Sequence, residues 1–141
     1  MPSLRSAIDA SASALEAQRI RMEVAVSNLA NAESTRSADG QPYRRREVVL
    51  QTQPFAAGLE GAGVHAAGVK VAAVVEDPTA FRRRYEPSHP DADADGFVAV
   101  PNVDVPEEMV DMLGAARAYQ ANLAAITVVR DTIAKALELA R

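Results

Sequence analysis

The sequence feature that most constrains the fold is an apolar repeat of seven residues over 105–141. One register of this repeat comprises Met109, Ala116, Leu123, Arg130 and Leu137, and the second comprises Met112, Tyr119, Ile126, Ile133 and Ala140. The steps between registers alternate three and four residues, which is typical of a coiled-coil seam. The pattern predicts a helix about 50 Å long at roughly 1.5 Å per residue. Arg130 alone breaks the stripe, so it either extends past a partner helix or sets its register through an ion pair.

A second heptad repeat near the N-terminus supplies the expected partner. Its apolar positions are Leu4, Ile8, Leu15, Met22, Val26 and Leu29, preceded by Ser3 as a possible helix cap. Asparagines at positions 28 and 31 favour the end of this helix, because Asn tolerates the left-handed conformation. Two stripes at opposite ends of one chain predict an antiparallel coiled coil, and an ordinary two-helix core is the alternative.

The residues between the helices predict a small β-rich insertion. Apolar runs bounded by turn residues predict strands at 43–53, 69–76, 81–86 and 97–100. Residues 33–41, 55–68 and 87–96 are rich in Gly, Ala, Ser, Asp or Pro, and they predict loops. The predicted fold is therefore α+β, with an N-terminal helical segment 1–33, a β-rich middle 34–101 and a C-terminal helical segment 102–141.

Composition removes several classes of function. The chain has 141 residues, no Cys and a net charge of −4, so it predicts neither a disulfide framework nor general attraction to nucleic acid. Asp9 and Glu16 interrupt the only candidate signal-peptide core, and no apolar run reaches the ~18 residues of a membrane span. We therefore expect a soluble chain whose export, if any, involves no cleaved signal.

Candidate chemical sites are each better explained as surface structure. Residues 91–96 alternate Asp and Ala before Gly96, as in the first half of a calcium loop, but Asn102 stands where that loop needs a bidentate Glu. The arginine triplets at 44–46 and 82–84 predict surface charge or ion pairs with a neighbouring subunit rather than a nucleic-acid site. His65 and His89 lack metal-ligand spacing. The sequence thus predicts no enzyme activity, no cofactor, no metal and no small-molecule substrate.

Three stretches together resemble the bacterial flagellar basal-body rod proteins, and within that family its C-type members. They are residues 27–35 (SNLANAEST), residues 85–98 (YEPSHPDADADGFV) and residues 100–112 (VPNVDVPEEMVDM) continued by 118–122 (AYQAN). The positions that carry the family motif are Asn28, Leu29, Asn31, Pro101, Asn102, Tyr119, Gln120 and Asn122. The stretches occur in order at both ends and in the middle, so the resemblance covers nearly the whole chain.

The resemblance implies a structural subunit of the proximal rod, which crosses the periplasm and transmits torque. It implies export through the flagellar type III apparatus without a cleaved signal, and assembly with other rod subunits and with copies of itself. The terminal helices would form the tube through Ile8, Leu15, Met22, Val26, Leu29, Met109, Met112, Ala116, Tyr119, Leu123, Ile126, Ile133 and Leu137. A helical adaptor or export chaperone that binds one partner through its heptad stripes is the alternative.

Overall fold

The computed structural model describes residues 4–54 and 67–139, and these residues form an α+β fold. In chain order the elements are α1 (Leu4–Ala30), β1 (Arg46–Pro54), β2 (Ala67–Glu76), β3 (Arg82–Tyr85), β4 (Phe97–Val100) and α2 (Val105–Leu139). Two long terminal helices around a β-rich middle are thus confirmed. The proposed cap Ser3, most of the predicted loop 55–68 and the last heptad position Ala140 lie outside the described residues.

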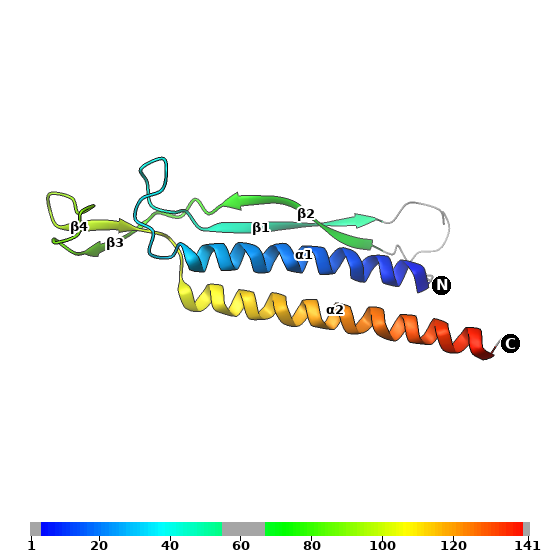
Figure 1. Cartoon of the computed structure of the whole chain (residues 1–141). Helices are drawn as coiled ribbons and strands as arrows, with labels where there is room; N and C mark the ends of the chain where they lie inside the picture. The colour runs from blue at the N-terminus through cyan, green and yellow to red at the C-terminus, as the bar shows by residue number, and fades with distance from the viewer. Residues whose placement is uncertain (1–3, 55–66, 140–141) are drawn as a thin grey trace.

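The elements stack in three layers with α1 in the centre (Figure 1). The β1–β2 hairpin runs along one side of α1, and α2 runs antiparallel to α1 along the other side. The β3–β4 hairpin lies beyond the end at which α1 stops and α2 begins. The molecule is therefore elongated and thin, and α1 is the element that has neighbours on two sides.

The four strands form two separate antiparallel pairs among the described residues, β1 with β2 and β3 with β4. β1 begins three residues later than the sequence predicts, because the preceding backbone is bonded elsewhere: the Tyr43 N–H donates to the Ser34 carbonyl, 3.0 Å away, and the Arg45 N–H to the Asn102 side chain, 2.9 Å away. A register shift at Val49/Leu50 bends the first hairpin.

Only one of the two predicted registers of α2 lies on the side that contacts α1. Its residues Met112, Tyr119, Ile126 and Ile133 are half-buried, and the other inner positions are Glu108, Ala115, Asn122 and Val129. The predicted register of Met109, Leu123, Arg130 and Leu137 is exposed, with Ala116 half-buried. It is therefore displaced by one residue from the positions that pack on α1.

Arg130 has neither of its predicted roles within this chain. Its side chain is exposed, and its nearest acidic partner is the adjacent residue Asp131, at 3.9 Å. On α1 the residues Ile8, Leu15, Met22 and Leu29 are half-buried, whereas Val26 is exposed. The fully buried apolar residues of the two helices are Ala17, Ala25 and Ala115, and such small side chains allow helix backbones to approach closely.

The β3–β4 hairpin depends on Gly96, whose φ of +80° favours glycine. A Cβ at this position would also lie 2.9 Å from the Tyr85 ring. We expect Gly96→Ala to lower the free energy of unfolding by about 1–3 kcal/mol, because it combines backbone strain with a steric clash. The measurement is urea unfolding followed by circular dichroism.

The matched control is Gly114→Ala in α2, where an added Cβ has nothing within 4 Å. Alanine is the better helix former, so this variant should gain about 0.5–1 kcal/mol. Equal stability of the two variants would show that the conformation of Gly96 does not limit the hairpin.

Candidate functional site

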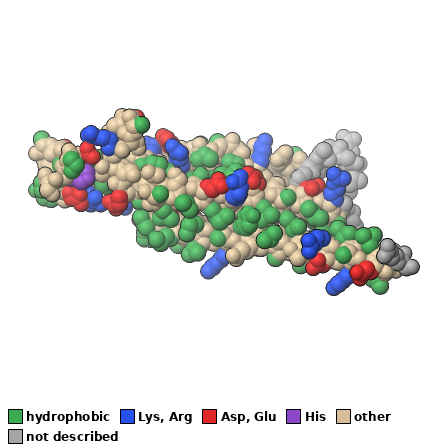
Figure 2. Space-filling model, in the orientation of Figure 1, with side chains coloured by type: hydrophobic (Ala, Val, Ile, Leu, Met, Phe, Trp, Pro, Cys, Tyr) green, Lys and Arg blue, Asp and Glu red, His purple; other side chains and the backbone are tan. Residues whose placement is uncertain are grey.

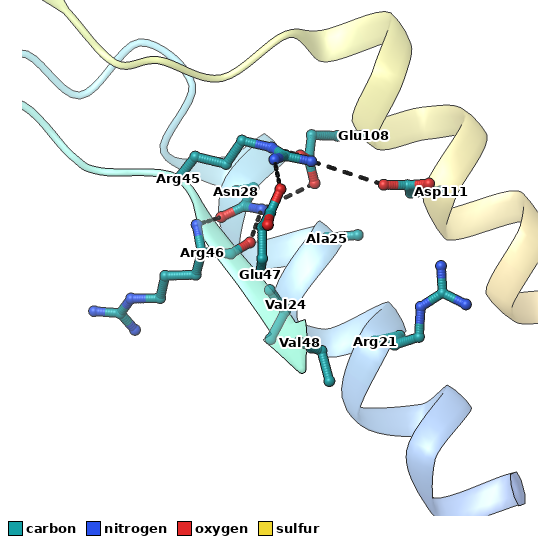
Figure 3. A pocket seen from close by; sticks show the side chains of 10 residues that line it. All are labelled: Arg21, Val24, Ala25, Asn28, Arg45, Arg46, Glu47, Val48, Glu108 and Asp111. Atoms are coloured by element: carbon teal, nitrogen blue, oxygen red, sulfur yellow. Dashed lines mark hydrogen bonds and ion pairs between the residues drawn. The ribbon is translucent and has the colours of Figure 1, made fainter. Parts of the chain in front are cut away.

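A buried polar junction joins α1, β1 and α2 where the two helices meet (Figure 3). Asn28 and Glu108 are its centre, with only 1% and 2% of their surfaces exposed. The Asn28 Nδ2 donates to Glu108 Oε2 and to the Arg46 carbonyl, each at 2.9 Å. Its Oδ1 accepts from the Tyr43 hydroxyl at 2.9 Å and from the Arg46 N–H at 3.0 Å. One amide thus bonds to three residues, Tyr43 and Arg46 at the start of β1 and Glu108 in α2.

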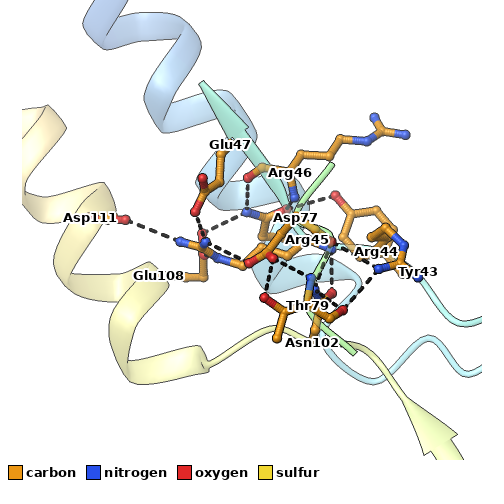
Figure 4. Close-up of polar contacts among 11 residues, drawn as sticks. Tyr43, Arg44, Arg45, Arg46, Glu47, Asp77, Thr79, Asn102, Glu108 and Asp111 are labelled. Atoms are coloured by element: carbon orange, nitrogen blue, oxygen red, sulfur yellow. Dashed lines mark hydrogen bonds and ion pairs between the residues drawn. The ribbon is translucent and has the colours of Figure 1, made fainter. Parts of the chain in front are cut away.

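Arg45 neutralises the buried Glu108 carboxylate (Figure 4). Its Nε donates to Glu108 Oε1 at 2.5 Å, and its guanidinium also pairs with Glu47 and, at 3.4 Å, with Asp77. Desolvation would lower the pKa of Arg45, but the hydrogen bonds and charges of Glu108 and Glu47 raise it above its usual value. Arg45 therefore stays charged, and the junction contains a paired rather than an isolated buried carboxylate.

A second tier of hydrogen bonds ties the turn after β2 to the entry of α2 (Figure 4). Asn102 Nδ2 donates to the carbonyls of Asp77 and Thr79, each at 3.3 Å, while its Oδ1 accepts from the Arg45 N–H. Arg44 donates to the same two carbonyls at 3.0 Å. Hydrogen bonds from the Thr79 hydroxyl and N–H lower the pKa of Asp77. These bonds fix the turn against both hairpin and helix.

The junction carries no visible chemistry. The pocket beside it, of about 150 Å³, is lined by residues that include Arg21, Glu47 and Asp111. That volume is below the roughly 300 Å³ at which small-molecule pockets begin. Among the described residues no group of three or more His, Asp or Glu could hold a metal ion.

The Asp93 carboxylate accepts from Arg83 at 2.5 Å and from the Phe97 and Asp95 N–H groups, so it acts as a turn cap. These contacts hold the turn between β3 and β4.

An uncovered row of apolar side chains lies on the side of α2 that faces away from α1. Figure 2 shows hydrophobic side chains gathered over the first half of this helix. We call the following roughly half-exposed or more exposed residues the outward face: Met109, Val110, Leu113, Leu123 and Val128. Between Asp111 and Arg130 the only charged residue of the sequence is Arg117. Exposed apolar surface of this kind marks a protein-contact site.

The residues of the family motif lie in the junction, at the end of α1 and along α2. Asn28 and Asn102 enter the junction, and Pro101 is buried beside it. Leu29 is half-buried, and the Asn31 side chain donates to the Ser27 carbonyl at 2.9 Å, closing the end of α1. Tyr119 and Asn122 lie half-buried on the inner side of α2, whereas Gln120 is exposed.

Sequence reasoning missed the pairing of Arg45 with Glu108. The prediction that the arginine triplets form surface charge or pair with a neighbouring subunit is wrong for Arg45, whose side chain is only 12% exposed, whereas Arg83 and Arg84 are surface charges with partners in the same chain. Arg45 pairs with Glu108, Arg83 with Asp93, and Arg84 with Glu33 at 2.7 Å, all within the chain. The available signal was the heptad itself, because a shift of one residue places Glu108 on the inner side of α2.

Comparison with known proteins identifies flagellar basal-body rod proteins as relatives of this chain. The family model described as Flagella basal body rod protein matches residues 8–36, and that described as Flagellar basal body rod FlgEFG protein C-terminal matches residues 94–139. The chain is 45% identical to the flagellar basal-body rod protein FlgC of Salmonella typhimurium, over 96% of this chain and 97% of that protein. It is 43% identical to FlgC of Bacillus subtilis, over 95% and 96%. For FlgC of Borreliella burgdorferi the identity is 36%, over 96% and 97%.

Within the described ranges, no helix combines the length and apolarity that a membrane span requires.

Proposed function

The chain belongs to the flagellar basal-body rod protein family, and we propose that this structural rod subunit assembles through the outward face of α2. The observation that carries the proposal is the nearly uncharged surface between Asp111 and Arg130. Each large apolar side chain gains about 1.5–3 kcal/mol when it is fully buried, so a row of them favours association. The junction holds α2 in a fixed direction, which keeps this face in one orientation on every copy.

We propose further that α1 and α2 pair as a coiled coil, and that the chain divides into an N-terminal segment 1–33, an insertion 34–101 and a C-terminal segment 102–141. The seam would use Met112, Tyr119, Ile126 and Ile133 against Ile8, Leu15, Met22 and Leu29, all of them half-buried. The exposed residues Val26, Met109, Leu123 and Leu137 then remain for contacts between subunits. When the face on one copy meets a different surface on the next and the rotation between copies does not close a ring, such contacts produce a helical filament.

Membership of the family is the basis for two further proposals, on where the subunit lies and on how it is exported. We propose that the subunit lies in the proximal rod, where it contacts other rod subunits and copies of itself, and serves as part of the periplasmic drive shaft. We propose that the flagellar type III apparatus exports it without a cleaved signal peptide. The adaptor or chaperone hypothesis receives no support from the relatives, which are named as rod proteins over almost their full length.

The direct test is a deletion of the gene, scored by electron microscopy of isolated basal bodies. We expect rods to be absent or truncated and swimming to be lost, with both restored by the wild-type gene. Intact rods that lack this subunit would refute the proposal. If the chain were absent from basal bodies and instead formed a soluble one-to-one complex with one dissimilar protein, the result would favour the adaptor hypothesis.

Amide exchange of the monomer should show a gradient along the helices. Residues 20–30 and 105–115 lie next to the junction, whereas residues 4–12 and 130–139 contain no fully buried position. Ordering a residue costs roughly 1–2 kcal/mol, which the half-covered ends recover only in part. We therefore expect fast exchange at those ends in dilute solution and protection after assembly. Full protection of both helices in the monomer would contradict the idea that neighbours complete them.

A further inference from the structure

A second polar pocket, of about 260 Å³, lies between the loop of residues 37–42 and the adjoining ends of β1 and β2. We call it the arginine pocket, and its lining includes Tyr43, Arg44, Arg46, Glu76 and Phe81. Backbone hydrogen bonds hold the loop in shape: the Ser37 N–H donates to the Gln41 carbonyl at 2.7 Å and the Gly40 N–H to the Ser37 carbonyl at 2.9 Å. The volume is below the roughly 300 Å³ of small-molecule pockets, so the pocket is of a size for a single side chain.

The two arginines of this pocket form no ion pair with any residue that the structure describes. Arg45, between them in the sequence, takes the acids of the junction. Arg44 donates only from Nη1, to the carbonyls of Asp77 and Thr79. The Arg46 side chain points away from the junction (Figure 3), and in the described ranges its only recorded contact is with a ring. Guanidinium donors of both residues are therefore available to another chain.

Aromatic rings hold both guanidinium groups in place. The Arg44 guanidinium lies 4.3 Å from the centroid of the Phe81 ring, and that of Arg46 lies 5.8 Å from the Tyr43 ring. Tyr43 is itself buried, and its hydroxyl donates to Asn28 at 2.9 Å. A planar donor group that is already positioned loses little conformational freedom when it binds a carboxylate. The pocket is therefore prepared for an anionic group before any partner arrives.

Two acids at the margin limit which anion the pocket accepts. Glu76 stands opposite Arg46 in the strand ladder, and Asp39 accepts from the Gln41 N–H at 3.2 Å. Both carboxylates line the pocket, yet neither forms an ion pair with a described arginine. They would repel a second negative charge on the bound group. The arrangement therefore favours a singly charged carboxylate over a phosphate, which carries nearly two charges at neutral pH.

We propose that the arginine pocket binds an Asp or Glu side chain from a different protein. The carboxylate accepts from Arg46 and from the remaining donors of Arg44, while Arg44 keeps its bonds to the turn. A second copy of this chain is less suited, because the acids of its protruding turn 91–96 are engaged: Asp91 pairs with Arg36 and Asp93 with Arg83. This inference goes beyond the proposed function, because it concerns neither helix.

The test is titration of the isotope-labelled full chain with blocked pentapeptides, followed by nuclear magnetic resonance of the arginine side chains. We expect the peptide Gly-Ser-Glu-Ser-Gly to shift the Nε–H signals of Arg44 and Arg46 saturably, and the same peptide with a central Gln to give no saturable shift. Arg46→Gln should weaken binding of the Glu peptide at least about fivefold. Its amide spectrum should otherwise match the wild type, because the Asn28 bonds involve only the backbone of Arg46.

Arg117→Gln is the matched control, since it removes the same charge at an exposed position of α2. This variant should bind the Glu peptide as the wild type does. Equal responses to the Glu and Gln peptides, or undiminished binding by Arg46→Gln, would overturn the site. Tighter binding of a phosphoserine peptide would overturn the choice of a carboxylate. Shifts of the Arg46 signal on concentrating the protein alone would identify a second copy as the occupant and overturn the choice of a different protein.

None of these measurements involves assembly. A failed titration therefore leaves the rod function standing, and loss of the rod function would leave the pocket to be judged on the titration alone.

Discussion

Glu108→Ala is expected to lower the free energy of unfolding by about 3 kcal/mol, which corresponds to a melting temperature lower by roughly 10 °C. The substitution removes the carboxylate that pairs with Arg45 at 2.5 Å and accepts from Asn28 at 2.9 Å. Both partners then remain at a buried site with lost hydrogen bonds, which is the costly way to break an ion pair. Arg45 keeps Glu47 and Asp77, so the expected loss lies at the lower end of the range for buried pairs.

Asp111→Asn is the matched control, because Asp111 is the next acidic residue on the same helix and faces the same arginine. Its carboxylate lies 3.8 Å from Arg45 and its side chain is 49% exposed, so solvent screens the interaction. We expect a loss below about 1 kcal/mol. Urea unfolding and thermal melts of the two full-length variants make the comparison. Similar losses in both would mean that burial of Glu108 does not organise the junction.

Val128→Glu is expected to abolish swimming while leaving the fold of the isolated subunit intact. Val128 lies on the outward face and is 63% exposed. Glutamate is the better helix former, so the isolated subunit should melt within a few degrees of the wild type. In an assembled rod the new carboxylate would be buried without a partner, at a cost of about 3 kcal/mol or more at each contact. That cost weakens every subunit contact by more than about a hundredfold.

Gln51→Glu, at an exposed position of β1, adds the same charge on the hairpin rather than on α2. This variant should swim normally in soft agar and appear in isolated basal bodies, whereas the Val128 variant should be missing from them. Normal swimming by Val128→Glu would show that the outward face of α2 stays exposed to solvent in the rod. A large drop in the melting temperature of the same variant would show instead that Val128 stabilises the monomer.

Elements with strong local signals could be predicted from the sequence. β4 has the predicted bounds, and α2 begins at the predicted residue because Pro106 suits a first helical turn and Asp104 caps it. β1 begins three residues late, since the Asn28 and Asn102 side chains bind the backbone that would otherwise continue the ladder. Those bonds join residues 18 and 57 positions apart in the chain. Local propensity carries no information about contacts over such separations.

The side of α2 that packs on α1 likewise depends on contacts between residues far apart in the sequence. α2 is apolar on two sides, so hydropathy alone does not distinguish the side that faces α1 from the side left for other subunits. Counting apolar residues therefore selects Met109 over Glu108 as the inner position. The structure reverses that choice, because Arg45 and Asn28 stabilise the carboxylate where an apolar side chain is expected.

By itself the sequence determined the two long helices, the β-rich insertion between them and the family, because periodicity, turn residues and short motifs are properties of neighbouring positions. Only the tertiary structure decided which of the two acids at the start of α2 is buried, which arginine neutralises it and which apolar stripe remains uncovered. The reason is physical: burial of a charge is tolerable only beside a partner of opposite charge, and Arg45 is brought to Glu108 from 63 positions away by the fold of the whole chain.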